Sequence, residues 1–87
     1  MVVATVTLIY FAKIRELIGT SEEEYPLPEA GATVQALLES LMARGEPYLG
    51  AFESGRVLAA INQEMVSLSS GVADGDELAL FPPVTGG

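Results

Sequence analysis

Apolar residues recur along this chain with two different periods, and each period predicts a type of element. From Val3 to Phe11 the run VATVTLIYF is rich in β-branched and aromatic residues, which is typical of a strand. From Thr33 to Gly45 the apolar residues recur at the spacing of one helix face, with Thr33 in the N-cap position and Gly45 at the end. The sequence therefore predicts an amino-terminal strand and one long helix, whose apolar face needs a sheet to pack on. That face consists of Val34, Leu37, Leu38, Leu41 and Met42.

The segment between these two elements predicts a short helix and an edge strand. AKIRELIG has apolar residues at helical spacing before Gly19, so one or two helical turns are expected there. The polar stretch that follows predicts a short strand from Glu23 to Leu27. Two prolines in and beside this strand disfavour a central position in a sheet.

The second half of the chain predicts short strands joined by turns. EPYLGAFESG predicts a loop, and RVLAAI and EMVSL predict the strands of a hairpin separated by Asn62 and Gln63. The segment GVADGDE predicts a turn built on Asp74, Gly75 and Asp76, which leads to a last strand, LALF. This order predicts a single α+β domain over residues 1–81, followed by an extended tail over residues 82–87.

Strand alternation assigns side chains to the two faces of the expected sheet. If the long helix covers the face with Leu8 and Tyr10, the opposite face carries Phe11, Met65 and Phe81. These large apolar groups form an exposed patch if their strands lie side by side, and such patches are typical of interaction sites. Alternatively, loops or the short helix cover them, or they lie apart, as single exposed apolar residues often do. The covered face is expected to include Val6, Leu8, Tyr10, Val66, Leu68, Leu78 and Leu80.

The composition excludes several classes of chemistry. The chain has no Cys and no His, which excludes cysteine-based metal sites, disulfides and thiol catalysis, and removes the usual general base near neutral pH. Its serines therefore lack a His to activate them, and its glycines match no phosphate-binding motif. The acidic runs at residues 22–24 and 74–77 fit a solvated edge and a turn better than a cation site. We therefore expect no metal site, no permanently bound cofactor and no autonomous catalysis.

The charge balance is strongly acidic. Four Lys and Arg residues against twelve Asp and Glu residues give a formal net charge of −8, which disfavours nucleic-acid binding and favours a partner with a basic face. The apolar amino-terminal residues lack the basic start and cleavage site of a secretory leader, and the run is too short to span a membrane. A cytoplasmic protein without membrane contact is the expectation.

The sequence LFPPVTGG at the carboxyl terminus allows two interpretations. It is an ordinary frayed end, or it is the functional part of the chain. Gly86 and Gly87 have no side chains and would fit a narrow channel of a partner. Pro82 and Pro83 favour extended backbone, and residues 82–87 would reach about 20 Å when extended. An ionised α-carboxylate at Gly87 is a nucleophile that would form an acyl adenylate with ATP.

Four segments together resemble the MoaD family of sulfur carriers, which is related to ubiquitin and to the thiamine-pathway carrier ThiS. They are YFAKIRELIG, LAAINQEMVSL, DGDELA and LFPPVTGG, in this order and over nearly the whole chain. The resemblance implies a β-grasp fold, in which one long helix crosses a mixed sheet and the first and last strands are adjacent at the centre.

The resemblance also implies a function and its partners. An E1-like enzyme, using ATP and magnesium, would adenylate Gly87, and sulfur from a persulfide donor would convert the adenylate to a thiocarboxylate. The tail of Pro82, Pro83, Val84, Thr85, Gly86 and Gly87 would then enter the large subunit of molybdopterin synthase, which holds most of the catalytic pocket. There the sulfur would build the dithiolene of molybdopterin from precursor Z. The implied partner-binding residues are Phe11, Arg15, Met65 and Phe81.

Three other functions remain open at this point. A ubiquitin-like protein modifier would use the same activated carboxylate, although a chain with one lysine, Lys13, is poorly suited to lysine-linked chains of itself. A thiamine-pathway carrier would differ in its acceptor, and a passive acidic interaction domain would not need Gly87. For any of the carriers, we expect the free chain to be monomeric or only weakly associated.

Overall fold

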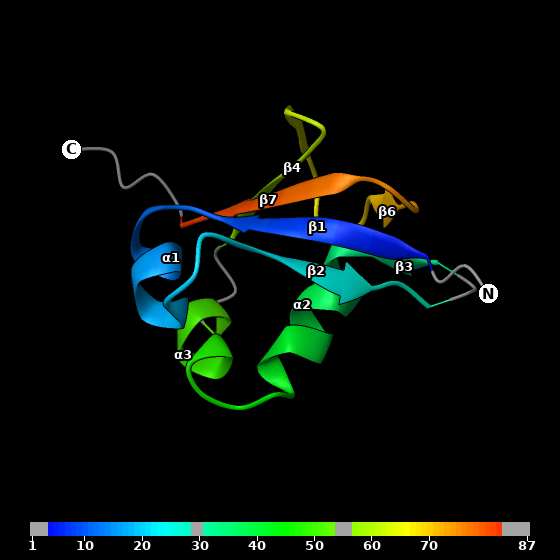
Figure 1. The fold of residues 1–87 in the computed structure, drawn as a ribbon. Coiled ribbons are helices and arrows are strands. Elements are labelled where there is room, and N and C mark those ends of the chain that lie inside the picture. Colours follow the sequence, from blue (N-terminus) through cyan, green and yellow to red (C-terminus); the bar gives the residue numbers. More distant parts are fainter. Residues whose placement is uncertain (1–3, 29–30, 54–56, 83–87) are drawn as a thin grey trace.

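The structure is a computed structural model that describes residues 4–28, 31–53 and 57–82 of the 87-residue chain. A mixed sheet forms one layer, and the helices pack beneath it (Figure 1). The strands are β1 (Thr5–Tyr10), β2 (Glu22–Pro26), β3 (Ala32–Thr33), β4 (Leu58–Ile61), β5 (Glu64–Val66), β6 (Gly71–Val72) and β7 (Glu77–Phe81). The helices are α1 (Ala12–Ile18), α2 (Val34–Met42) and α3 (Tyr48–Phe52).

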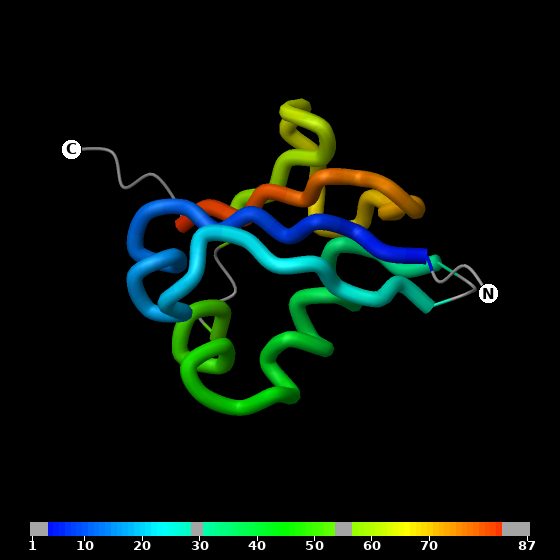
Figure 2. The backbone as a smooth tube through the Cα atoms, in the orientation of Figure 1, coloured from blue at the N-terminus to red at the C-terminus, as the bar shows by residue number. Residues whose placement is uncertain are grey.

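The main sheet brings the first and last strands together. Its order is β2-β1-β7-β4-β5, and β1 and β7 pair in parallel, with Leu8 opposite Leu78 and Tyr10 opposite Leu80. The other pairs are antiparallel, and β3 and β6 form a separate two-stranded sheet. The tube in Figure 2 shows β1 in blue and β7 in orange to red running side by side. This is the β-grasp topology that the resemblance implied, so the predicted fold class is confirmed.

The core lies between the main sheet and α2. The hydroxyl of Thr33 accepts a hydrogen bond from the amide of Ala36 at 3.1 Å, which confirms the predicted N-cap. Four residues of the predicted helical face are buried, and the side chains of β1 and β7 that face them are also buried. The predicted covered face is thereby confirmed, because Val66 and Leu68 are half-buried and pack against the same core.

The structure corrects three predictions of secondary structure. EPYLGAFESG contains the short helix α3, whose Phe52 is fully buried in the core, and is not the predicted loop. The strand predicted over EMVSL ends at Val66. The segment predicted as a turn before the last strand begins with β6, which pairs with β3. These elements depend on partners that are remote in sequence.

A charged and aromatic cluster fastens β2 to the helical layer. The guanidinium of Arg44 donates to Oε1 of Glu23 at 2.8 Å, and the hydroxyl of Tyr10 donates to the same oxygen at 3.2 Å. The guanidinium carbon lies 4.9 Å from the ring centroids of both Tyr25 and Tyr48. Burial, and then the Glu23 carboxylate, raise the pKa of Tyr10 well above its usual range. Burial lowers the pKa of Arg44, but its hydrogen bonds and opposite charges outweigh this effect and raise it overall.

Candidate functional site

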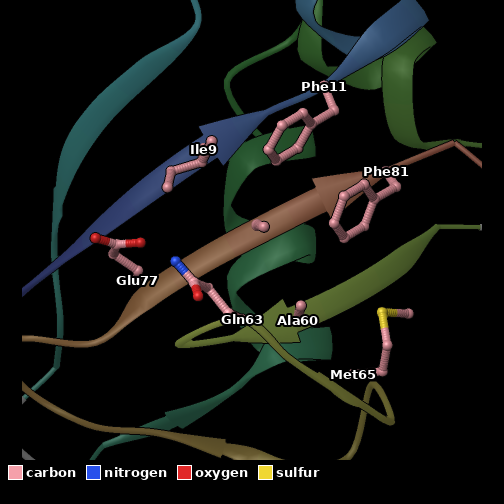
Figure 3. Close-up of a pocket in the computed structure, with 8 residues that line it drawn as sticks. Ile9, Phe11, Ala60, Gln63, Met65, Glu77 and Phe81 are labelled. Atoms are coloured by element: carbon pink, nitrogen blue, oxygen red, sulfur yellow. The ribbon is translucent and has the colours of Figure 1, made fainter.

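The side chains predicted to form an outward patch do lie together. Phe11, Met65 and Phe81 line one open depression with a volume of about 320 Å³, on the face of the sheet that α2 does not cover (Figure 3). Phe11 is 39% exposed and Met65 is 59% exposed, so the depression offers apolar surface to solvent. The remaining lining residues are Ile9, Ala60, Gln63, Glu77 and Ala79. An exposed apolar depression of this kind suits the binding of an apolar group from a partner.

Phe11 and Phe81 are positioned by the adjacent ends of β1 and β7. The amide of Phe11 donates to the carbonyl of Leu80 at 3.2 Å, which extends the pairing of the two strands. The two rings then stack, with centroids 4.8 Å apart and an interplanar angle of 13°. The chain leaves β1 at Ala12 with a φ of 51°, a left-handed conformation that costs an alanine about 1 kcal/mol. The stack therefore forms where β7 ends and the tail begins.

Met65 reaches the depression from a hairpin. It lies opposite Ala60 in the β4–β5 pairing, and Ala60 lies opposite Ala79 in the β4–β7 pairing. The hairpin turns at Asn62 and Gln63, with φ angles of 50° and 72°. Two such residues in succession are typical of the tight turn whose twist matches that of the strands. The small Ala60 and Ala79 also line the depression, and Met65 lies at its rim (Figure 3).

Arg15, the fourth predicted partner-binding residue, lies outside the depression. It is an exposed residue of α1, and its amide donates to the carbonyl of Phe11 at 3.3 Å. It is not among the residues that line the depression. The structure therefore brings together Phe11, Met65 and Phe81 and leaves Arg15 beside them on the helix.

The predicted tail begins within the described residues and continues outside them. Pro82 directly follows the last residue of β7 and is half-buried. Pro83, Val84, Thr85, Gly86 and Gly87 lie outside the described residues, so the geometry of the tail stays a prediction. The candidate site that the structure describes is thus the apolar depression next to the start of the tail.

The sequence contains enough information to place two further lining residues on this face. Ile9 and Ala79 lie on the same strand faces as Phe11 and Phe81, so alternation alone would place them there. Gln63 and Glu77 lie at strand ends, where alternation is least informative. Of the eight lining residues, Glu77 alone has an acidic or basic side chain, and most of the others are apolar.

Two kinds of site are absent from the described part of the chain. Across residues 4–28, 31–53 and 57–82, no group of three acidic, His or Cys side chains could hold a metal ion. None of the helices in these ranges is long and apolar enough to cross a membrane.

Comparison with protein families gives a match over most of the chain. The model of the ThiS family matches residues 8–87. The molybdopterin synthase sulfur carrier subunit of Escherichia coli (strain K12) is 43% identical over 82 residues, which cover 94% of this chain and 99% of the relative. The family match extends from within β1 through α2 to the carboxyl-terminal block.

Solved structures of similar proteins have the same fold. The putative molybdopterin converting factor, subunit 1, from Pyrococcus furiosus has a TM-score of 0.74 and 36% identity, covering 93% of this chain and 99% of that chain. Small archaeal modifier protein 1 of Haloferax volcanii has a TM-score of 0.72 and 30% identity, covering 93% of this chain and 99% of that chain. Sequence and fold therefore agree with the resemblance that the terminal block first indicated, and the chain belongs to the ThiS/MoaD family.

Proposed function

We propose that this chain is the sulfur carrier subunit of a molybdopterin synthase. The observation that carries the proposal is the 43% identity, over nearly the full length of both chains, to a protein with that name. The block FPPVTGG, residues 81–87, supports the same assignment. The chain would act in the cytoplasm as the small, sulfur-donating member of a two-subunit sulfurtransferase.

The reacting group in this proposal is the α-carboxylate of Gly87. One of its oxygens attacks the α-phosphorus of ATP, and pyrophosphate leaves, so that the carboxyl becomes a mixed anhydride with AMP. The terminal sulfur of a persulfide then displaces AMP from the acyl carbon, and a thiol cleaves the S–S bond of the acyl persulfide, which yields the thiocarboxylate and a disulfide. An E1-like enzyme supplies the site for ATP and magnesium. This chain supplies only the carboxylate and the surface by which the enzyme holds it.

The described part of the chain suits the delivery of such a tail. β7, which leads into the tail, is held between β1 and β4 in the middle of the sheet. The stack of Phe11 on Phe81 fixes the last strand residue before Pro82. A partner that binds the depression would therefore receive residues 83–87 from a defined starting point. We propose that the partner is the large synthase subunit, which holds most of the catalytic pocket and uses the sulfur to convert precursor Z to molybdopterin.

A protein modifier is the second candidate function. The likeness to small archaeal modifier protein 1, at 30% identity, favours it. A modifier would use the same activated carboxylate but would form an isopeptide bond with a lysine of a target. The activation step does not separate the two functions, whereas the final acceptor does.

Intact mass spectrometry tests the proposal in two steps. The chain is first incubated with ATP, magnesium, an E1-like activating enzyme and a persulfide donor. We expect a mass shift equal to the replacement of one oxygen by sulfur, and we expect the variant that lacks Gly87 to show no shift. The charged chain is then mixed with precursor Z and the large synthase subunit, which should produce molybdopterin.

The two steps separate the candidates. A thiocarboxylate that supports no molybdopterin formation, together with covalent conjugates of the chain in the same mixture, would favour the modifier. No mass shift, with the activating enzyme competent on another carrier, would contradict the sulfur carrier and leave the modifier or a passive domain.

A further inference from the structure

On the uncovered face of the main sheet, the side chains change from apolar to acidic along the strands. At the end next to Pro82 the side chains are large and apolar, with Phe81 opposite Leu58 and stacked on Phe11. The next row of paired residues is also apolar, and it consists of Ile9, Ala79, Ala60 and Met65. Six residues of these rows supply the apolar lining of the depression in Figure 3: Ile9, Phe11, Ala60, Met65, Ala79 and Phe81.

The far end and the β2 edge of the same face are acidic. Glu24, Thr7 and Glu77 are paired across three strands in the row beyond the apolar ones. Glu22 pairs with Ile9 and so ends the apolar row at the β2 edge. All three glutamates are exposed. We name Glu22, Glu24 and Glu77 the acidic rim.

The acidic rim lies close enough to act together with the apolar depression. Glu77 is four residues before Phe81 on β7, a separation of about 13 Å along the strand. Adjacent strands are about 5 Å apart, which places Glu24 about 10 Å from Glu77 across β1. These spans match the Debye length of about 10 Å at 0.1 M ionic strength, so a partner over the depression would experience the rim.

Neighbouring cations do not neutralise this rim. Lys13 and Arg15 lie on α1, which begins directly after Phe11 at the apolar end of the face. Arg44 bonds Glu23, which points to the opposite, helix-covered side of β2. Arg56 lies outside the described residues. Among the described hydrogen bonds and ion pairs, none engages a side chain of the acidic rim.

Glu77 connects the acidic rim to the apolar depression, because it belongs to the rim and also lines the depression. A partner group that fills the depression would cover this carboxylate and remove it from water. A carboxylate that is buried without a counter-charge costs several kcal/mol, so a purely apolar partner surface would bind poorly. The partner must therefore place a cationic donor over Glu77 when its apolar group enters.

We propose that this face docks a protein surface with an apolar group flanked, about 13 Å away, by Lys or Arg side chains that meet the acidic rim. This inference rests on the proposed function and takes the large synthase subunit as the partner. The apolar contact supplies affinity, and the rim accelerates and orients encounter. Because the apolar and acidic ends differ, the docked partner lies with a single orientation relative to the start of the tail.

Association kinetics with the purified large subunit test this surface. The variant Glu22→Gln/Glu24→Gln/Glu77→Gln removes the three rim charges and keeps the side-chain size. Its matched control, Glu16→Gln/Glu39→Gln/Glu53→Gln, removes three exposed charges on or beside the helices. At about 20 mM salt we expect the rim variant to associate about 10-fold more slowly, and the control to stay within about twofold of the unaltered chain.

The salt dependence gives a second readout. The association rate of the unaltered chain should fall as salt rises, and the rim variant should show a flatter dependence. Equal slowing of both variants would overturn the inference, because net charge alone would then be acting. An unchanged rate for the rim variant would overturn it as well. If the unaltered chain neither binds the large subunit nor becomes thiocarboxylated, the proposed function itself fails, and that result precedes any comparison of variants.

Discussion

Arg44 shows how one side chain joins parts of the fold that the sequence keeps apart. It follows α2, yet it reaches Glu23 and Tyr25 on the edge strand β2 and Tyr48 on α3. Its guanidinium plane is suited to stacking between two rings while it donates to a carboxylate. The pair is partly exposed, with side-chain exposures of 37% for Arg44 and 24% for Glu23, so solvent screens much of the ionic part.

Replacement of Arg44 should measure this contribution. We expect Arg44→Met to lower the free energy of unfolding by about 1 kcal/mol, because two cation–π contacts and a screened ion pair are lost. Arg44→Lys keeps the charge but not the planar stacking, so its loss should be intermediate. Urea denaturation followed by circular dichroism measures both. Arg15→Met, at an exposed position of α1, is the control and should change stability by less than about 0.5 kcal/mol. A loss for Arg44→Met no larger than that of the control would contradict this role.

At the scale of elements, the β4–β5 hairpin places Met65 at the rim of the depression. Its turn residue Asn62 also binds the start of β7, since its amide nitrogen donates to Asp76 at 3.0 Å and its oxygen accepts from the amide of Glu77 at 3.0 Å. Gln63 has a left-handed φ of 72°, and within the described residues its side chain forms no hydrogen bond. The two turn residues therefore have different roles despite similar backbone angles.

Glycine substitutions should separate these two roles. We expect Gln63→Gly to raise the free energy of unfolding by about 0.5 to 1 kcal/mol, because glycine adopts a positive φ without the steric cost. Asn62→Gly should lower it by about 1 to 2 kcal/mol, because two hydrogen bonds to the β7 end are lost and Asn already tolerates this conformation. Thermal and urea denaturation of both variants provide the measurement. A gain in stability for Asn62→Gly would show that backbone strain outweighs the hydrogen bonds.

The sequence assigned buried and exposed faces most fully to the elements with several repeats of a period. Alternation in β1 and β7 and helical spacing in α2 are long enough to assign both strands and faces, and so to bring Phe11 and Phe81 together. α3 has five residues and β3 and β6 have two each, so no period develops within them. They form because Phe52 enters the core and because Ala32 pairs with Val72, contacts that span the chain. The depth and lining of the depression likewise depend on Gln63 and Glu77, which lie at element ends.

At the scale of the whole molecule, the two faces of the sheet differ in what covers them. One face packs on α2 and holds the buried core. The other face exposes an apolar depression beside the start of the tail in a chain with a net charge of −8. That net charge opposes self-association through this face, because two copies would bring their acidic rims together. The free chain is accordingly expected to be a monomer in dilute solution, with the face available to a partner of opposite charge.

A pair of matched substitutions tests whether this face, and not apolar surface in general, binds the large subunit. Met65 on β5 and Leu49 on α3 are both exposed apolar residues, at 59% and 39% exposure. We expect Met65→Asp to weaken binding about 10- to 100-fold, because docking would bury a carboxylate without a partner, whereas Leu49→Asp should stay within about twofold. Both variants add one negative charge, so general electrostatic effects cancel, and both should unfold at nearly the same urea concentration as the unaltered chain. Calorimetric titration with the large subunit gives the two affinities. Equal losses would place the binding surface elsewhere on the molecule, and a loss confined to Met65→Asp would place the partner on the face from which the tail starts.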